Sequence, residues 1–376
     1  MIRVLITGLT DKIDGVGMYV YNLVTNIDKD KVIFDFLVQG RNGVALEKSL
    51  RENYKTDCKF YQVPAFKDNL LASMKYLKRL YRSKHYDYVY VNASLSTDLY
   101  YVLPFIIRFG KSRVIVHSHN SSLYGKEKQH YCFQWLPKLC AGVKLTCSDK
   151  AAEWMFGSSE GVRIIHNGID TEKFRFSEAY RAEIRQKYDI DDDTLVIGHV
   201  GRLMYQKNQE FLIRIMADMK KRGIRARLLL VGEGEDRNKL EKLVKDNNLT
   251  EYVIFCGQQK ETEKYYSAFD VFAMPSHYEG LPIVGIEAQA SGLPCIFSDK
   301  IDRQVLLIDQ ADMIDLNSGA EYWRILIEDA PKVSAINREA YAEVIGNMEF
   351  GIKGVAEEIE DLLMKQYKSP SGAWET

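Results

Sequence analysis

The most informative segment of this chain is Ser276-His277-Tyr278-Glu279-Gly280-Leu281-Pro282-Ile283-Val284-Gly285-Ile286-Glu287. It follows an apolar run, Val271 to Met274, which predicts a buried strand. Pro282 suits the first residue of a helix, because its φ is close to the helical value and its missing N–H is not needed there. The predicted order of elements is therefore a strand, a loop that contains glycine and the beginning of a helix.

The beginning of this helix has the features of a phosphate site. The backbone N–H groups of Ile283 and Val284 are expected to point out of the helix end, where they attract an anion. Glu279 in the loop and Glu287 on the helix lie on either side, with seven residues between them. A diphosphate at the helix end, flanked by two carboxylates that accept hydrogen bonds from hydroxyl groups, would suit a nucleotide-linked sugar.

The spacing of the two carboxylates also matches a known family. Glu279 and Glu287 resemble the E-x7-E motif of the retaining glycosyltransferases of family 4, within a surrounding pattern Pro-Ser-x-x-Glu-Gly-Leu-Pro. Two spaced acids alone are more often a loop acid and a solvated helix acid, so the embedded Gly280-Leu281-Pro282 carries the specificity. The resemblance implies an α/β fold of the GT-B type, in which two doubly wound Rossmann-like domains face each other across a cleft.

The length and the charge distribution indicate two domains with different partners. A chain of 376 residues exceeds the usual size of a single hydrophobic core. Residues 1–170 contain 24 Lys and Arg against 16 Asp and Glu, whereas residues 171–376 contain 27 against 36. The basic first part indicates an anionic partner. Nucleic acid is not that partner, because the whole chain has a net charge of −1 and contains no recognised nucleic-acid module.

The sequence shows neither a membrane span nor an export signal. No uninterrupted apolar run reaches membrane-spanning length, and Met1-Ile2-Arg3 leads directly into a strand. The six cysteines include no Cys-x-x-Cys pair, so we expect reduced, buried thiols rather than a zinc site or a disulfide framework. The expected location is the cytoplasm, with the inner face of the cell membrane as the alternative.

The first domain is predicted to be a parallel, doubly wound sheet, because strands and helical segments alternate along it. The predicted strands are Arg3–Thr7, Val32–Val38, Phe60–Val63, Tyr88–Val91, Val114–His117, Val143–Thr146 and Val162–Ile165. After the first strand, Gly15 and Gly17 lie in a loop that leads into a helix near Gly17. They predict either a ligand-binding loop or a plain tight turn. The dinucleotide fingerprint G-x-G-x-x-G is absent, and Asp14-Gly15 stands where family members often have Gly-Gly.

His119 and Asn120 follow the strand Val114–His117, at the end of the sheet where ligands gather. This position resembles that of a histidine of the family near the donor sugar and the acceptor. The resemblance implies that His119 makes a hydrogen bond to a sugar hydroxyl. A histidine at a strand end is by itself more often structural, and we expect that role for His117.

The domain boundary is predicted near residue 171. His166-Asn167-Gly168-Ile169-Asp170 resembles the connection between the two domains of the family, and Gly168 allows a hinge turn. The predicted domains are residues 1–170, which would bind the acceptor, and residues 171–351, which would bind the nucleotide sugar. The pattern from Ile336 to Gln366 predicts helix. The resemblance implies that the last part, about 352–376, packs back on the first domain.

The second domain contains two cations close to a glycine at a strand end. Gly201, Arg202 and Lys207 follow the strand Leu195–Val200 and resemble the Gly-Arg-Leu-x-x-x-Lys-Asn segment of the family. Their positive charge would stabilise a departing diphosphate, so that no bound metal and no cofactor is needed. The resemblance further implies that backbone groups near Gln258 hold the base. The remaining predicted donor contacts are Gly280, Leu281, Pro282, Ile283 and Val284.

A basic amphipathic helix is predicted near residue 75. Its cations are Lys75, Lys78, Arg79, Arg82 and Lys84, interleaved with Leu70, Leu71, Met74, Leu77, Leu80 and Tyr81. Such a face suits anionic lipid headgroups or a lipid-diphosphate acceptor. An ordinary helix with a solvated basic face is an equal alternative.

These patterns lead to one functional hypothesis with three alternatives. The hypothesis is a retaining, metal-independent glycosyltransferase that moves a hexose from a nucleotide diphosphate sugar, by family frequency a UDP-sugar. Its acceptor would be a lipid-linked saccharide of a bacterial capsule or exopolysaccharide. The alternatives are a GT-B epimerase that acts on the nucleotide sugar alone, a dehydrogenase with two doubly wound domains, and a non-catalytic partner in a polysaccharide assembly complex.

Overall fold

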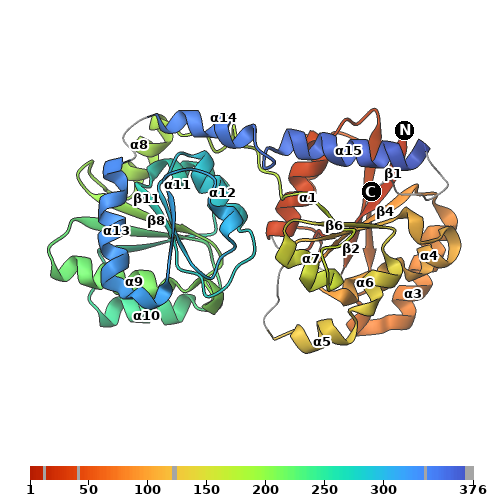
Figure 1. Cartoon of the computed structure of the whole chain (residues 1–376), viewed down its shortest axis with the longest axis horizontal. Coiled ribbons are helices and arrows are strands. Elements are labelled where there is room, and N and C mark those ends of the chain that lie inside the picture. The colour runs from red at the N-terminus through yellow and green to blue at the C-terminus, as the bar shows by residue number, and fades with distance from the viewer. Residues whose placement is uncertain (12–13, 40–42, 121–124, 334–336, 369–376) are drawn as a thin grey trace. The chain divides into compact units, whose positions relative to one another are not determined.

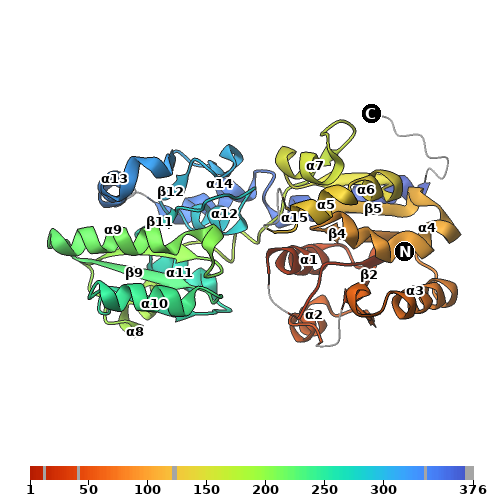
Figure 2. The same cartoon turned by 90° about the horizontal axis from the view of Figure 1, so that it is seen from below.

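The computed structural model describes residues 1–11, 14–39, 43–120, 125–333 and 337–368. Two compact units make up the chain (Figure 1). The first unit consists of Met1–Ile169 and Glu349–Thr376, and the second consists of Asp170–Met348. Each unit has a parallel sheet between two layers of helices, which the view in Figure 2 also shows. The predicted pair of doubly wound α/β domains is therefore confirmed.

The sheet of the first unit has seven parallel strands in the order β3-β2-β1-β4-β5-β6-β7. Their bounds are β1 Ile2–Ile6, β2 Val32–Gln39, β3 Phe60–Val63, β4 Tyr88–Ala93, β5 Val114–Ser118, β6 Val143–Thr146 and β7 Arg163–Ile164. The central strands β4 and β5 are buried at every position, which explains their continuous apolar runs, since helices cover both faces of such a sheet.

Alternate side chains of the first sheet belong to two different cores. Val4 and Ile6 pack with the apolar residues of α1 (Gly15–Asn26) and α15 (Ile352–Lys368). Leu5, between them, belongs to the core on the opposite face, as the two-residue period of a strand requires. The helices on that face include α3 Phe66–Ser83, α4 Leu103–Phe109, α6 Trp135–Cys140 and α7 Asp149–Phe156. The other helices of this unit are α2 Glu47–Tyr54 and α5 Glu127–Cys132.

The C-terminal region is not the single helix that its pattern predicts. Within the described residues it consists of a 3-10 turn at Arg338–Ala340, α14 (Tyr341–Gly346) and α15. The helix breaks because the backbone near Gly351 pairs with Ile169: Ile169 N–H donates to Phe350 O at 2.9 Å, and Ile352 N–H donates to Ile169 O at 2.9 Å. Ile336 and residues 369–376 of the predicted helical segments lie outside the described residues.

The sheet of the second unit has six parallel strands in the order β10-β9-β8-β11-β12-β13. Their bounds are β8 Leu195–Val200, β9 Ala226–Val231, β10 Val253–Gly257, β11 Val271–Met274, β12 Cys295–Ser298 and β13 Ala311–Ile314. The helices are α8 Glu178–Lys187, α9 Gln209–Lys221, α10 Arg237–Asp246, α11 Thr262–Ala268, α12 Ile283–Ala290, α13 Gly319–Val333 and α14. The sequence pattern gives no sign of β13, because this edge strand is short and only its first residue is buried.

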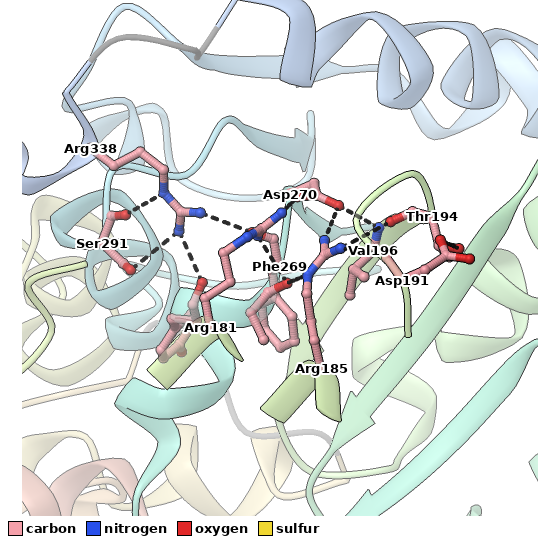
Figure 3. A network of polar contacts seen from close by, with 11 residues as sticks. Arg181, Arg185, Asp191, Thr194, Val196, Phe269, Asp270, Ser291 and Arg338 are labelled. Carbon is pink, nitrogen blue, oxygen red and sulfur yellow. Dashed lines mark hydrogen bonds and ion pairs between the residues drawn. The ribbon is translucent and has the colours of Figure 1, made fainter. Parts of the chain in front are cut away.

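A network of arginines ties the helices of the second unit to the start of β11 (Figure 3). Arg181 and Arg185 on α8 pair with the two carboxylate oxygens of Asp270, at 2.7 and 2.6 Å. Arg338 donates to three backbone carbonyl groups, those of Tyr266, Phe269 and Ser291, each at 3.0 Å. These carbonyls lie near the C-terminal ends of α11 and α12, where the last helical C=O groups lack helical partners. The arginines therefore fix how these two helices join the sheet.

Two further predictions concern the whole chain. Five of the six cysteines are buried, whereas Cys132 is exposed, which corrects the expectation that all six are buried. None of the helices in the described ranges is long and apolar enough to cross a membrane.

Candidate functional site

The candidate donor site lies on two loops that follow neighbouring strands of the second unit. Strands β8 and β11 are parallel and directly paired, so their carboxyl ends lie at the same edge of the sheet. The loop after β8 spans residues 201–208, and the loop after β11 spans residues 275–282. Hydrogen bonds join the two loops, among them His277 N–H to Gln206 O at 2.8 Å, Asn208 Nδ2 to Pro275 O at 2.9 Å and Gln206 Nε2 to Tyr278 O at 3.0 Å.

An ion pair between these loops brings two predicted residues together. Lys207 Nζ lies 2.6 Å from Glu279 Oε1, and the two side chains are 14% and 13% exposed. Gln206 Nε2 donates to the same oxygen at 3.0 Å. A cation and a carboxylate at the end of adjacent parallel strands, both largely removed from water, form a polar centre that can bind an anion and a hydroxyl group side by side.

Arg202, the second predicted cation, does not pair with Glu279 as Lys207 does. Its side chain is exposed and its Nε lies 3.0 Å from Glu235 Oε2, in an ion pair at the surface. Glu235 belongs to the Gly-Glu-Gly-Glu turn after β9, whose two glycines have a packing role. A Cβ at Gly232 would lie 2.0 Å from Gly201 O, and one at Gly234 would lie 2.1 Å from Leu203 O. The turn therefore packs directly against the loop that carries Arg202, and only glycine at positions 232 and 234 permits such close packing of the two backbones.

The start of α12 has the arrangement that the sequence predicts, shifted by one residue. Pro282 is the N-cap residue, with a ψ of 117°, and not the first helical residue, so the helix begins at Ile283. The N-cap residue Pro282 makes no side-chain hydrogen bond to this helix end. Leu281 and Pro282 are buried, whereas Gly280, Ile283 and Val284 are partly exposed. The N-cap side chain therefore leaves the backbone N–H groups of this helix end unoccupied, as an anion site requires.

Glu287 lies one turn further along α12, in a setting that favours its neutral form. Its side chain is partly buried, and Tyr266 Oη donates to its Oε2 at 2.8 Å. Burial raises the pKa of Glu287 to about 7, while the hydrogen bond from Tyr266 lowers that pKa and limits the rise. Tyr266 has no signature in the sequence, because only the packing of α11 against α12 brings it to Glu287.

Gln258 stands apart from these residues. It is exposed and follows Gly257 at the end of β10. Since β9 lies between β10 and β8, Gln258 lies two strands away from the loop of Lys207.

In the first unit, both ring nitrogens of His119 contact side chains of the protein. Its Nδ1 lies 2.7 Å from Asn167 Oδ1, and its Nε2 lies 2.8 Å from Asn92 Oδ1. Asn92 Nδ2 donates to Thr7 O at 2.6 Å, so Asn92 turns its oxygen toward the ring and Nε2 is the donor. Burial lowers the pKa of His119 to about 4, so the neutral ring carries a single N–H and can donate to only one of these two amide oxygens at a time. A sugar hydroxyl would have to replace one of these partners.

His117 lies beneath His119 in a closed network. Its Nε2 donates to Ile165 O at 3.1 Å, and its Nδ1 accepts from Tyr90 Oη at 2.7 Å. Tyr19 Oη lies 3.1 Å from Tyr90 Oη. All three side chains are buried, which agrees with the structural role that we expected for His117.

The glycine loop of the first unit is closed by a cap. Helix α1 begins at Gly15, two residues earlier than predicted, because Asp14 is its N-cap residue and accepts from Gly17 N–H at 2.8 Å. Burial raises the pKa of Asp14. Gly15 is exposed, Gly17 is buried and Asn120 is partly exposed. The carboxylate of Asp14 accepts the hydrogen bond from Gly17 N–H that a phosphate oxygen could otherwise accept. This helix start therefore favours a neutral ligand over an anionic one.

Comparison with known structures identifies the fold class. The structure described as "Crystal structure of Anabaena Alr3699/HepE in complex with UDP-glucose" superposes on 97% of this chain and 100% of that chain, with a TM-score of 0.79 and 19% identity. The fold is GT-B, as the sequence predicted.

Comparison with known sequences identifies the family. The family description "Glycosyltransferase Family 4" matches residues 13–173, and "Glycosyl transferases group 1" matches residues 180–311. EpsF of Bacillus subtilis (strain 168), a glycosyltransferase by name, is 30% identical over 347 residues, which cover 89% of each chain. A second relative, named "UDP-Gal:alpha-D-GlcNAc-diphosphoundecaprenol alpha-1,3-galactosyltransferase", from Escherichia coli, is 26% identical over 78% of this chain and 80% of its own. The chain belongs to the family 4 glycosyltransferases.

Proposed function

We propose that this glycosyltransferase transfers a hexose from a UDP-sugar to a lipid-linked saccharide with retention of configuration and without a metal ion. The observation that carries the proposal is the pair Lys207–Glu279 beside the uncapped start of α12, with Glu287 one turn further along. A diphosphate needs a cation and free N–H groups, and a sugar ring and a ribose each need an acceptor for their hydroxyl groups. The second unit supplies all of these on two adjoining loops and one helix.

Each predicted residue then has a role in donor binding. The N–H groups from Gly280 to Val284 bind the diphosphate and sugar hydroxyls, while Glu287 accepts from the ribose. Glu279 accepts from a hydroxyl of the transferred sugar and orients the ring. Lys207 carries three N–H donors, so it can remain paired with Glu279 and also donate to the diphosphate. Arg202 would leave Glu235 for a phosphate oxygen, and backbone groups near Gln258 would hold the base.

The transfer step follows from these roles. The bond between the anomeric carbon of the sugar and the diphosphate oxygen breaks, and negative charge grows on that oxygen. Lys207 stabilises this charge. Electrostatic stabilisation of the charge that develops in the transition state is usually the largest single contribution to the rate of such a step. The acceptor hydroxyl attacks from the face that the diphosphate leaves and gives its proton to the departing phosphate. The first unit supplies the acceptor side, with His119, Asn120, Gly15 and Gly17 as its proposed contacts.

Two comparisons support the choice of donor and acceptor. The structural relative was crystallised with UDP-glucose, and the E. coli relative is named for UDP-galactose and a diphosphoundecaprenol-linked sugar. A third relative, from Mycobacterium tuberculosis (strain ATCC 25618 / H37Rv), is named GDP-mannose-dependent and is 33% identical over 38% of this chain. GDP-mannose is therefore the donor to test against UDP-sugars.

The surface of α3 supports an anionic lipid as the carrier of the acceptor. A groove of about 620 Å³ runs along this helix, lined by Leu71, Met74, Lys75, Lys78, Arg79, Arg82 and Ser83. Leu70 and Leu71 are 53% and 82% exposed, and Ile107 on the neighbouring α4 is 81% exposed. Exposed apolar side chains beside four cations fit a bilayer surface that contains anionic lipids, because each cation near such a surface contributes about 1 kcal/mol.

The enzymatic proposal is tested by incubating the full chain with UDP-glucose, UDP-galactose, UDP-N-acetylglucosamine or GDP-mannose and a lipid-diphosphate-linked sugar. We expect transfer from one UDP-sugar, with the α configuration of the donor kept in the product when its anomeric proton is measured by NMR. Transfer with inversion would refute the retaining mechanism. Conversion of the donor to an isomer without acceptor would instead identify an epimerase.

The membrane proposal is tested by sedimentation with vesicles of phosphatidylcholine alone or with added phosphatidylglycerol. We expect binding to the anionic vesicles that falls as salt rises, since salt screens surface charge. Lys75→Glu combined with Lys78→Glu should abolish this binding. The matched control Lys221→Glu, at an exposed cation of α9 in the second unit, should keep it. Equal sedimentation of both variants would contradict the assignment of this surface.

A further inference from the structure

One buried tyrosine of the second unit contacts the donor-site carboxylate directly. Tyr266 lies on α11 and is fully buried. Its hydroxyl donates to Glu287 Oε2 at 2.8 Å and lies 3.2 Å from Val284 O, so it touches both the carboxylate and the first turn of α12. The phenol has a single proton to donate. The shorter contact, to the carboxylate, is the one that matches a normal O–H···O distance.

We propose that Tyr266 is a positioning residue that holds one oxygen of Glu287, so that the other oxygen faces the ribose hydroxyl groups of the donor. The inference rests on the proposed function of this site. A carboxylate that is free to rotate would have to be ordered when the nucleotide binds, and that ordering costs affinity. A carboxylate held before binding avoids this cost.

The surroundings of Tyr266 fix its ring in place. Its ring packs against Phe174, Phe269 and Phe272, with centroids 5.7 to 6.0 Å apart. Its backbone carbonyl accepts from Arg338 at 3.0 Å. Arg338 also binds the carbonyls of Phe269 and Ser291, which places the ends of α11 and α12 in one network (Figure 3). The hydroxyl of Tyr266 is therefore held at a set position relative to α12.

Burial brings the pKa of Glu287 close to neutral pH, where the hydrogen bond from Tyr266 affects whether the carboxyl group is ionised. Two charged groups face it, Lys173 from the segment before α8 and Glu263 one turn before Tyr266 on α11. Lys173 Nζ lies 3.5 Å from Glu263 Oε2. Burial and Glu263 raise the pKa of Glu287, whereas Tyr266 and Lys173 lower it. The pKa of Tyr266 lies well above its ordinary value because of burial, so the phenol remains a donor near neutral pH. Tyr266 thus favours the ionised form of Glu287, which is the form that accepts from ribose.

The test is calorimetric titration of the full chain with UDP between pH 6 and pH 8.5. In Tyr266→Phe, a hydrogen bond to a charged group is lost, and we expect UDP to bind about tenfold more weakly at pH 7. The midpoint of the pH dependence of UDP affinity should also move to higher pH, because the carboxyl group of Glu287 loses the donor that favours its ionised form. In Glu287→Gln the affinity should be lower and independent of pH in this range.

A neighbouring tyrosine provides the matched control. Tyr265 is equally buried, and its hydroxyl lies 3.0 Å from Lys187 Nζ and 3.3 Å from Tyr188 Oη, away from Glu287. Tyr265→Phe should leave both the affinity for UDP and its pH midpoint unchanged. If Tyr266→Phe fails to fold, the variant Tyr266→3-fluorotyrosine replaces it. Its more acidic phenol is a stronger donor and should move the midpoint downward.

The outcomes separate the two proposals. If the wild type binds neither UDP nor GDP at any pH, the proposed function fails and the role of Tyr266 fails with it. If the wild type binds UDP but Tyr266→Phe, or the fluorinated variant in its place, has the wild-type affinity and midpoint, the positioning role alone is overturned. An equal change in Tyr265→Phe would show a general packing effect and would also overturn it.

Discussion

Replacing Lys207 by methionine should separate its structural role from its catalytic role. Lys207 and Glu279 are 14% and 13% exposed and lie 2.6 Å apart. Methionine keeps most of the aliphatic length of lysine but removes the charge. Glu279 then remains in a largely buried position with Gln206 as its hydrogen-bond donor.

The expected effect on stability follows from this burial. At 2.6 Å the attraction between the two charges is about 6 kcal/mol for an effective dielectric constant of about 20, before desolvation is subtracted. Breaking a fully buried pair costs about 3 to 5 kcal/mol. Because Glu279 keeps some exposure and one donor, we expect Lys207→Met to lose about 2 kcal/mol. Adding Glu279→Gln removes the unpaired charge and should restore at least half of this loss.

The expected effect on transfer is different. Loss of a cation that stabilises the departing diphosphate should lower the turnover rate by about a hundredfold or more. The double variant should recover stability but not activity. Urea unfolding and sugar transfer are measured on the same preparations, with Lys242→Met as the control. Lys242 is 76% exposed and pairs with Asp246 at 2.5 Å, so its loss should change stability by less than about 0.5 kcal/mol. Near wild-type transfer by Lys207→Met would refute the role of Lys207, and recovery of transfer in the double variant would show that its role is only structural.

Three further predictions concern pH, packing and metal. First, the pKa of Glu287 is raised from 4.5 to about 7 in the folded protein, so its contribution to stability is fully present below pH 4.5 and is lost as pH rises to 7. The wild type should therefore lose stability relative to Glu287→Gln between pH 5 and pH 8 in urea unfolding, and a constant difference would contradict the shift. Second, a Cβ at Gly198 would lie 1.9 Å from Phe269, whereas one at Gly354 meets nothing within 4 Å. Gly198→Ala should lower stability by about 2 kcal/mol or more, whereas Gly354→Ala, within α15, should raise it by up to about 1 kcal/mol. The reverse order of melting temperatures would contradict the packing. Third, transfer should continue at an unchanged rate after dialysis against EDTA, and restoration of a lost activity by Mg²⁺ or Mn²⁺ would refute metal independence.

Sequence patterns predicted the parts of the second unit that local chemistry determines. The strand, loop and helix order around Glu279 follows from an apolar run, a glycine and a proline, and the structure shifts only the helix start, from Pro282 to Ile283. The meeting of Lys207 with Glu279 could be anticipated as well, since both follow strands of a parallel sheet. The pairing of β8 with β11 places the two loops at one edge.

Contacts that depend on tertiary packing could not be predicted. Tyr266 reaches Glu287 only because α11 packs beside α12, and Arg202 turns to Glu235 because two glycines let the turn after β9 approach. The periodicity of the C-terminal segment gives no sign that Gly351 pairs with Ile169 and breaks the helix. His119 was expected to have a nitrogen available for a sugar hydroxyl. Asn92 and Asn167, from distant parts of the sequence, contact both of its nitrogens.

The start of α12 is the proposed binding site for the diphosphate of a nucleotide sugar. This proposal is best tested by a crystal structure of the full chain soaked with UDP. We expect the phosphate groups to lie against the N–H groups of Ile283 and Val284, within reach of Lys207, with the ribose at Glu287. UDP bound elsewhere, with a side chain or solvent at the start of α12, would contradict it.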